Sequence, residues 1–252
     1  MTTPPFRHLA TRCVHAGEGD DPHGSPHPPL YTATTFGFPD TEAVLDAVEG
    51  RSDASLYTRY GMNPTIRALE AKLAGLEDAE AALAFASGMA AETALFLAHG
   101  RDGVVCIGDA YGGTLELLAE HLPSMGVPTH FLLGDELDRL DGLLADGVGL
   151  VFVETPTNPA LEVFDIAALA ERAHAHGARL AVDNTFATPV NQQPLALGAD
   201  LVVHSATKYL GGHGDLTAGA LMGPAALLEP VWAWRKALGS APDPRTADLL
   251  AR

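Results

Sequence analysis

A lysine and two hydroxyl residues follow one of the most apolar segments of the chain. Ser205, Thr207 and Lys208 form S-A-T-K directly after L-V-V-H. Because Lys208 follows a buried strand, we expect its side chain to be buried there. Burial lowers the proton affinity of an amine and makes it a nucleophile toward carbonyl groups. The hydroxyls can donate hydrogen bonds to an anion. A solvated lysine in a strand-to-loop turn, with both hydroxyls bonded to nearby backbone, is the alternative.

An acidic residue ends a second apolar segment. Asp183 follows R-L-A-V and precedes N-T-F. A carboxylate beside a pyridine nitrogen keeps that nitrogen protonated, so that the ring can accept electrons. A carboxylate that caps a turn or a helix is the alternative.

A possible anion site follows a third apolar segment, A-A-L-A-F-A, at Ser87, Gly88 and Met89. Serine caps helices, glycine lets a ligand approach the backbone, and the free N–H groups of a helix N-terminus bind phosphate. An ordinary helix cap is the alternative. The segment is not a P-loop, because no lysine follows the glycine at the required spacing.

Aromatic, amide and guanidinium groups complete the candidates. Arg59 in Y-T-R can contact a phosphate with two N–H groups, and Tyr57 adds a hydroxyl. Tyr111 in D-A-Y-G-G-T can stack on a flat ring, and Asn158 lies in E-T-P-T-N-P. Taken singly, each of these residues is better explained by packing or turn formation. The order of anion site, aromatic ring, amide, acid and lysine, each at a predicted strand end, favours one shared ligand site.

Short β-branched segments alternate with Ala- and Leu-rich segments of helical period from about residue 64 onward. This alternation predicts a mostly parallel sheet covered by helices, with ligands at the carboxyl ends of the strands. The predicted strands are the run before Ser87 and Gly103–Gly108, Thr129–Leu133, Leu150–Glu154, Arg179–Asp183, Leu201–Ser205 and Ala218–Met222. The predicted helices are Thr65–Ala74, Met89–Ala98, Thr114–His121, Glu136–Ala145, Ile166–His176 and Ala225–Ala237, with a further helix beginning near the end of the chain.

The composition of the 252 residues indicates a globular chain and argues against several partners. Apolar residues make up 47% of it, and a formal net charge of −17 opposes binding to nucleic acid or anionic membranes. No apolar segment approaches the ~20 residues of a membrane span, and the N-terminus lacks an apolar signal core. Cys13 and Cys106 are too few for a disulfide framework and have no metal-ligand spacing. We expect a cytoplasmic protein without a bound metal.

Together the motifs resemble those of the cystathionine/methionine-metabolism, or trans-sulfuration, family of pyridoxal-phosphate-dependent enzymes. The resemblance runs from about Thr11 to Gly223 and is most specific around Lys208. It is carried by H-A-G-E-G-D-D, P-P-L-Y-T-A-T-T-F, Y-T-R-Y-G-M-N-P-T, A-S-G-M-A-A, D-A-Y-G-G-T, V-F-V-E-T-P-T-N-P, A-V-D-N-T-F-A-T-P and H-S-A-T-K-Y-L-G-G-H-G-D. It implies an α/β, fold-type-I (aspartate-aminotransferase-like) large domain with a mostly parallel seven-stranded sheet and helices on both faces. It also implies a homotetramer, a dimer of dimers with shared active sites.

The resemblance implies a role for each candidate residue. Lys208 is similar to the Schiff-base lysine that carries pyridoxal 5'-phosphate and moves protons, Asp183 to the partner of the pyridine nitrogen, and Tyr111 to a ring-stacking residue and catalytic acid/base. The other implied cofactor contacts are a phosphate cup of Ser87, Gly88, Met89, Ser205 and Thr207, the pair Tyr57 and Arg59 from a neighbouring subunit, Asn158 near the ring hydroxyl, and Thr185 and Glu154 as supports. The implied reaction is elimination or replacement on cystathionine, O-acylhomoserine or a similar small sulfur amino acid.

The same resemblance divides the chain into three parts. Residues 1–62 correspond to an N-terminal arm and inter-subunit segment, 63–238 to the cofactor-binding large domain, and 239–252 to the start of a missing C-terminal domain that carries an arginine for the substrate carboxylate. Because residues 1 to about 40 are rich in Pro, Gly and His, we expect this part of the arm to be extended.

Two local departures from the family pattern affect the expectations. Met62 adds a residue between Gly61 and Asn63, which changes the reach of Arg59. Gly113 stands where many methionine γ-lyases carry a cysteine, and this disfavours methionine γ-lyase activity.

Three other interpretations stay open. The chain could be a non-catalytic truncated remnant that binds the cofactor at most. It could be a fold-type-I aminotransferase, although Tyr111 in Y-G-G-T and the Tyr57–Arg59 pair argue against that. It could be a nucleotide-binding doubly wound domain, although it lacks a Gly-rich fingerprint after a first strand.

Overall fold

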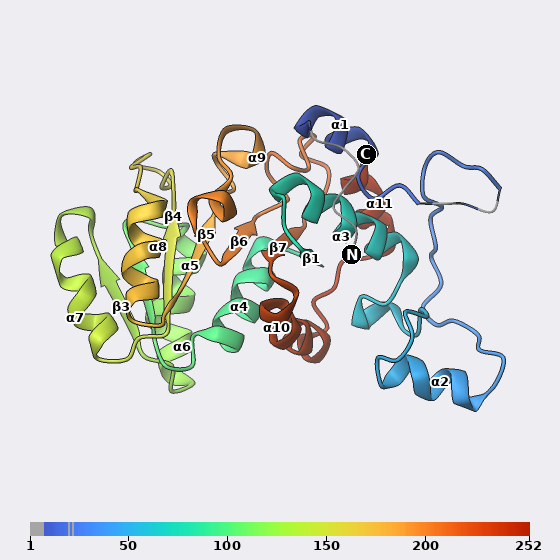
Figure 1. Ribbon diagram of the computed structural model, residues 1–252, viewed down its shortest axis with the longest axis horizontal. Coiled ribbons are helices and arrows are strands. Elements are labelled where there is room, and N and C mark those ends of the chain that lie inside the picture. Colours follow the sequence, from blue (N-terminus) through green and yellow to red (C-terminus); the bar gives the residue numbers. More distant parts are fainter. Residues whose placement is uncertain (1–7, 20, 22) are drawn as a thin grey trace.

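A mostly parallel sheet of seven strands lies at the centre of the computed structural model (Figure 1). The structure describes residues 8–19, 21 and 23–252. The strand order is β1-β7-β6-β5-β4-β2-β3, in which β7 runs antiparallel to both neighbours and the other neighbouring pairs are parallel. The strands are β1 (Ala81–Phe85), β2 (Val104–Ile107), β3 (Thr129–Leu132), β4 (Leu150–Glu154), β5 (Arg179–Asp183), β6 (Leu201–His204) and β7 (Gly219–Gly223). The predicted α/β fold with its seven-stranded sheet is confirmed.

The central strands are apolar because they are covered on both faces. Every residue of β2, β4 and β6 is buried, which explains the continuous runs V-V-C-I, L-V-F-V and L-V-V. The six strands that were predicted with bounds differ from the observed strands by at most one residue at either end. The carboxyl ends of β4, β5 and β6 therefore meet at one edge of the sheet, as the sequence predicts.

Helices pack on both faces of the sheet (Figure 1). One face packs against α4 and α10 around the buried rings of Phe85, Phe96 and Phe152. The other face packs against α7 and α8 beside β2, β4 and β5, and against α3 and α11 beside β1 and β7. The helices are α1 (Leu9–His15), α2 (Thr41–Val48), α3 (Pro64–Glu77), α4 (Gly88–His99), α5 (Gly112–Glu116), α6 (Leu122–Ser124), α7 (Leu140–Ala145), α8 (Ile166–Ala175), α9 (Thr188–Asn191), α10 (Ala225–Leu238) and α11 (Pro244–Ala251). Short 3-10 segments are η1 (Thr58–Tyr60), η3 (Gly134–Arg139) and η4 (Pro194–Leu197), and η2 (Leu117–His121) is a π-helical segment.

The arm contains two short helices. The first, α1, lies within residues 1 to about 40, so the expectation of an extended segment there is wrong. Helix α1 packs on α3, where Arg12 Nη1 donates a hydrogen bond to Gly75 O at 3.0 Å. Helix α2 begins at Asp40, whose carboxylate accepts from Ala43 N at 2.8 Å, and lies far from the sheet (Figure 1). The seven and eight residues of these helices give too short a pattern beside the Pro- and Gly-rich flanks. Residues 1–7, 20 and 22, part of the same prediction, lie outside the described residues.

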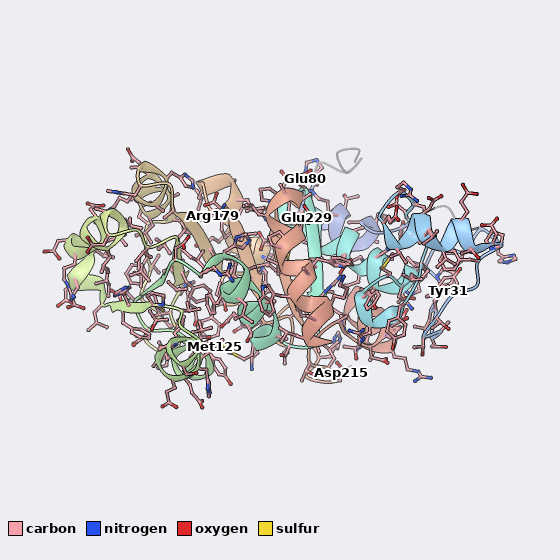
Figure 2. All side chains as sticks on the ribbon, turned by 90° about the horizontal axis from the view of Figure 1, so that it is seen from below. Tyr31, Glu80, Met125, Arg179, Asp215 and Glu229 are labelled. Carbon is pink, nitrogen blue, oxygen red and sulfur yellow. The ribbon has the colours of Figure 1, made fainter. Side chains whose placement is uncertain are left out.

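The last two helices pack on the same body as the sheet. Ala247 and Leu250 of α11 are buried against α3, and the division of the chain at residue 238 stays a prediction. At the start of α10, Ala225 N donates to the Glu80 carboxylate at 3.0 Å; Figure 2 labels Glu80 and, farther along this helix, Glu229. Within the described residues, no helix combines the length and apolarity that crossing a membrane requires.

Candidate active site

A cavity of about 220 Å³ lies at the carboxyl ends of β4, β5 and β6. Ligands bind at this edge in open parallel sheets, and near the place where strand order reverses. All predicted cofactor contacts except Tyr57 and Arg59 line the cavity. The lining residues are Ser87, Gly88, Met89, Glu92, Tyr111, Glu154, Asn158, Asp183, Thr185, Phe186, Ser205, Thr207, Lys208 and Thr217.

The N-terminus of α4 forms one wall of the cavity. The Ser87 hydroxyl caps the helix by accepting from Ala90 N at 3.1 Å. A Cβ atom at Gly88 would lie 2.9 Å from the Cα of Ser205, so glycine allows the helix and the end of β6 to approach this closely. Because the first-turn N–H groups of a helix lack intrahelical partners, this wall suits an anionic group such as a phosphate.

A buried carboxylate, Asp183, lines the cavity at the end of β5. Its Oδ1 accepts from Thr185 N at 2.8 Å, and the Thr185 hydroxyl accepts from Ser205 N at 2.8 Å. Burial raises the pKa of Asp183, and the hydrogen bonds from Thr185 partly offset this rise. Thr185 thus links the end of β5 to the start of the S-A-T-K segment and fixes the position of the acid.

Lys208 lines the cavity, but its side chain is exposed, so the expectation of a buried amine is wrong. The residue lies beyond β6 in a turn, where its N–H donates to Ser205 O at 3.0 Å and its carbonyl accepts from Gly212 N at 2.8 Å. A turn at the edge of a cavity leaves the amine hydrated. The Thr207 hydroxyl donates to Ala218 O at 3.1 Å and accepts from Ala218 N at 3.0 Å. For Thr207 this is the alternative stated above, in which a hydroxyl of S-A-T-K bonds to the backbone and not to an anion.

Tyr111 and Asn158 approach the cavity from loops after β2 and β4. The Tyr111 side chain is 51% exposed, which leaves its ring free to cover a ligand. Its N–H donates to Glu154 Oε2 at 2.8 Å. Burial and the charge of Asp183 raise the pKa of Glu154 to about 8. Glu154 therefore supports the backbone of Tyr111, in keeping with the supporting role expected of it.

Tyr57 and Arg59 lie outside this cavity. Arg59 Nη1 donates to Lys236 O at 2.6 Å, and its guanidinium lies over the rings of Tyr57 and Tyr60. Tyr57 pairs with Thr35 in an isolated β-bridge. The pair therefore belongs to a different part of the same chain, where Arg59 is held by contacts within that chain.

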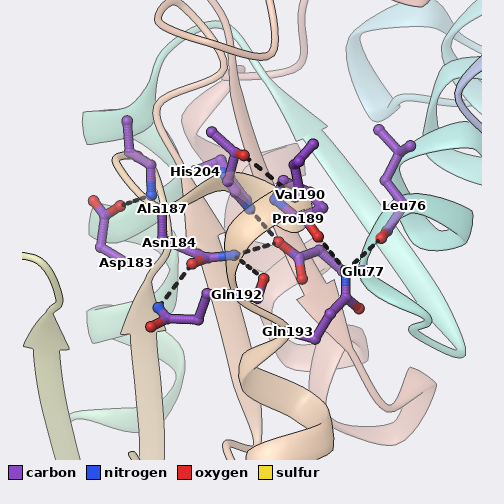
Figure 3. A network of polar contacts seen from close by, with 12 residues as sticks. Leu76, Glu77, Asp183, Asn184, Ala187, Pro189, Val190, Gln192, Gln193 and His204 are labelled. Carbon is purple, nitrogen blue, oxygen red and sulfur yellow. Dashed lines mark hydrogen bonds and ion pairs between the residues drawn. The ribbon is translucent and has the colours of Figure 1, made fainter. Parts of the chain in front are cut away.

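A buried polar network supports the strand ends from the opposite face of the sheet (Figure 3). Glu77, at the end of α3, accepts from His204 Nε2 at 2.6 Å and from Asn184 Nδ2 at 2.8 Å. Adjacent residues of a strand point to opposite faces, so Asn184 and His204 anchor the backbone that carries Asp183 and Ser205 into the cavity. Glu77, Asn184 and His204 are each at most 1% exposed. This support was not predicted from the sequence, where its only signal is a histidine at the end of an apolar strand.

Glu92 is a cavity residue that the sequence analysis also missed. It is 3% exposed and lies on α4, four residues after Gly88, which places both on one face of the helix. The spacing of four residues from Gly88 could have indicated that Glu92 faces the same site. The Ala- and Leu-rich sequence around it instead suggested a helix that serves only packing.

The sequence is similar to curated enzymes that act on sulfur amino acids. It is 40% identical to the L-methionine gamma-lyase of Pseudomonas putida over 249 residues, which cover 97% of this chain and 62% of that enzyme. It is 42% identical to the cystathionine gamma-synthase of Mycobacterium bovis over 247 residues, 96% of this chain and 62% of that enzyme. The chain thus spans less than two thirds of the length of these relatives.

Solved structures and a family model agree with this similarity. The crystal structure of MetB from Corynebacterium glutamicum matches with a TM-score of 0.90 and 39% identity, over 99% of this chain and 64% of that one. Cystathionine gamma-lyase from Lactobacillus plantarum matches with a TM-score of 0.87 and 36% identity, over 97% of this chain and 62% of that one. The family model for Cys/Met metabolism pyridoxal-phosphate-dependent enzymes matches residues 10–252. The chain therefore belongs to the Cys/Met metabolism family of pyridoxal-phosphate-dependent enzymes.

Proposed function

We propose that this chain binds pyridoxal phosphate at Lys208 and supports elimination or replacement reactions on sulfur amino acids such as cystathionine or O-acylhomoserine. The observation that carries the proposal is a single cavity lined by a lysine, a buried carboxylate, an exposed tyrosine ring and a helix N-terminus. When bound, pyridoxal phosphate supplies an electron sink for charge that develops at the substrate α-carbon.

The residues around the cavity fit each part of this cofactor. The first turn of α4, with Ser205, suits the phosphate, because Gly88 lets these two segments of the cavity lining lie close together. Asp183 suits a protonated pyridine nitrogen, because a cation beside a buried carboxylate favours its ionised form. Tyr111 suits the ring face, and Lys208 suits the aldehyde.

Two side chains would move protons in the reaction. The amine of Lys208 would take the proton from the substrate α-carbon and return it at a neighbouring atom, a role open to an exposed lysine at the edge of the cavity. The hydroxyl of Tyr111 would serve as the second acid or base at the leaving group. Loss of a γ-substituent requires proton removal at the β-carbon, which either group could perform in turn.

The position of Tyr111 also bears on the choice of substrate. A Cβ atom at Gly113 would lie 2.8 Å from Tyr111 Cε1 and 3.2 Å from Met89 Sδ, so a larger residue there would displace the ring. The cysteine found here in many methionine γ-lyases would therefore require a different Tyr111 position. On this difference from those enzymes we propose cystathionine or an O-acylhomoserine ahead of methionine as the substrate.

We further propose a cytoplasmic homo-oligomer, a dimer of dimers, in which Tyr57 and Arg59 reach the phosphate in a neighbouring subunit. Their absence from the lining of the cavity in their own chain supports this arrangement, as does the part of the arm that extends away from the sheet (Figure 1). Release of Arg59 from Lys236 O would be needed for that contact.

The test is covalent attachment of the cofactor. The protein with pyridoxal phosphate should show the visible absorbance of a lysine-bound aldehyde, and borohydride should trap the cofactor on the peptide that contains Lys208. Lys208→Ala should abolish both signals. Lys236→Ala, which replaces a lysine of α10 outside the cavity lining, should retain them. An unchanged band and unchanged trapping in Lys208→Ala would refute the assignment. Assays with cystathionine and O-acylhomoserine, scored for ammonia and an oxo acid or for a transferred amine, would then separate lyase, synthase and aminotransferase chemistry.

A further inference from the structure

Glu92 connects two parts of the cavity that lie far apart in the sequence. Its carboxylate accepts a hydrogen bond from the Thr114 hydroxyl at 2.6 Å. Glu92 belongs to α4, whose N-terminus forms the wall suited to phosphate, and Thr114 belongs to α5, which begins directly after Tyr111. Both side chains are at most 3% exposed, so the bond is shielded from water.

The bond acts on the tyrosine through the first turn of a helical segment. Helix α5 continues without a break into η2 and α6, and in its first turn Thr114 N and Leu115 N both donate to Tyr111 O, at 2.9 and 3.1 Å. The end of a helix opens more easily than its middle, so the position of this first turn depends on side-chain contacts. The Tyr111 N–H is held separately by Glu154. Two carboxyl groups thus fix the backbone on either side of the Tyr111 ring.

Glu92 is also part of the electrostatic environment of the cavity. It lines the cavity together with Asp183 and Glu154. Burial, and next the charge of Asp183, raise the pKa of Glu92 well above its usual value. A neutral carboxyl can keep its bond with Thr114 without adding a further negative charge beside Asp183. Glutamine would preserve these properties, whereas leucine would preserve only the approximate volume.

We propose that Glu92 is a positioning residue of the cofactor site: through Thr114 it holds the helix that carries Tyr111 against the helix whose N-terminus receives the phosphate. The inference rests on the proposed function for its cofactor part. The link between the two helices is a property of the unliganded chain and is tested without any ligand.

The first measurement is hydrogen exchange of the unliganded protein. Glu92→Leu should speed exchange in residues 111–116 by about tenfold, because a buried hydrogen bond that holds this segment is lost. Glu92→Gln should exchange like the wild type. Glu171→Leu, an exposed glutamate on α8, is the matched control and should leave this segment unchanged. Wild-type exchange in Glu92→Leu, or equal acceleration in Glu92→Gln, would overturn the proposal.

The second measurement is the affinity for pyridoxal phosphate, followed by its visible absorbance. Glu92→Leu and Thr114→Val should each weaken binding by about tenfold, and the double variant should be no weaker than either alone, because both remove the same bond. Glu92→Gln should restore wild-type binding. Fully additive losses would overturn the proposal. If the wild type binds no pyridoxal phosphate, the proposed function fails, while the exchange result still decides the role of Glu92.

Discussion

Glu77 lies at the centre of the buried network behind the cavity, and its replacement should destabilise the fold strongly (Figure 3). Glu77→Leu leaves one N–H of His204 and one N–H of Asn184 without an acceptor, while the other N–H of the Asn184 amide keeps its hydrogen bond to Gln192 O at 3.1 Å. Each buried donor left unpaired costs about 1–3 kcal/mol. Among the described atoms, Glu77 Oε2 is itself buried without a hydrogen-bond partner, so its removal offsets roughly 1–2 kcal/mol of that cost. We expect a net loss of about 1–4 kcal/mol in the free energy of unfolding.

Urea unfolding of four proteins tests this value. The wild type and Glu77→Leu give the loss, and Glu77→Gln, which keeps one acceptor oxygen, should lose about half as much. Glu171→Leu replaces an exposed glutamate and should stay within about 0.5 kcal/mol of the wild type. A loss below roughly 1 kcal/mol in Glu77→Leu, or an equal loss in Glu77→Gln, would show that the shared acceptor does not hold the strand ends.

Two further predictions concern the cavity. Burial and neighbouring charge raise the pKa of Glu154 to about 8 from 4.5, so its contribution to stability is complete below pH 4.5 and is lost as the pH rises through 8. The unliganded protein should therefore lose thermal stability between about pH 5 and 8, and Glu154→Gln should flatten this slope; an equal slope in the variant would contradict the assignment. Gly88→Ala places a Cβ atom 2.9 Å from the Cα of Ser205 and should weaken pyridoxal phosphate binding at least about tenfold, whereas Gly142→Ala, which meets nothing within 4 Å, should bind like the wild type. Wild-type affinity in Gly88→Ala, measured by absorbance titration, would show that this wall is not tightly packed.

The fold was predictable where local pattern and burial agree. Strand β4 is an apolar run buried on both faces, so its bounds in the sequence and in the structure are the same. Helix α8 begins at Asp165, whose carboxylate accepts from Ala168 N at 3.1 Å, and its apolar period continues from that cap. Helices α1 and α2 were not predictable in this way, because packing on α3 and a single cap stabilise segments too short to show a period.

The residues at the strand ends that line the site were predictable from the sequence, but the buried residues that hold them in position were not. Asp183 and Lys208 follow apolar strands, and parallel strands bring such residues to one edge. The exposure of Lys208 was not predictable, because it depends on the turn that follows β6 and on what closes the cavity. Glu77 and Glu92 act through partners that are 127 and 22 residues away in the sequence, and no local pattern links such pairs.

The placement of β7 between β1 and β6 has a consequence for synthesis of the chain. Within the described residues, β1 pairs with β7 alone, and Ala81 lies opposite Gly223. Strand β1 is synthesised before the other strands of this sheet but gains a neighbour only after β7 has been made. Closing the long loop between them is slow. Until then its apolar edge is open to chaperones or to other nascent chains. Assembly of the sheet is thus a late event, and capture of a cofactor by a growing polypeptide would have to follow it.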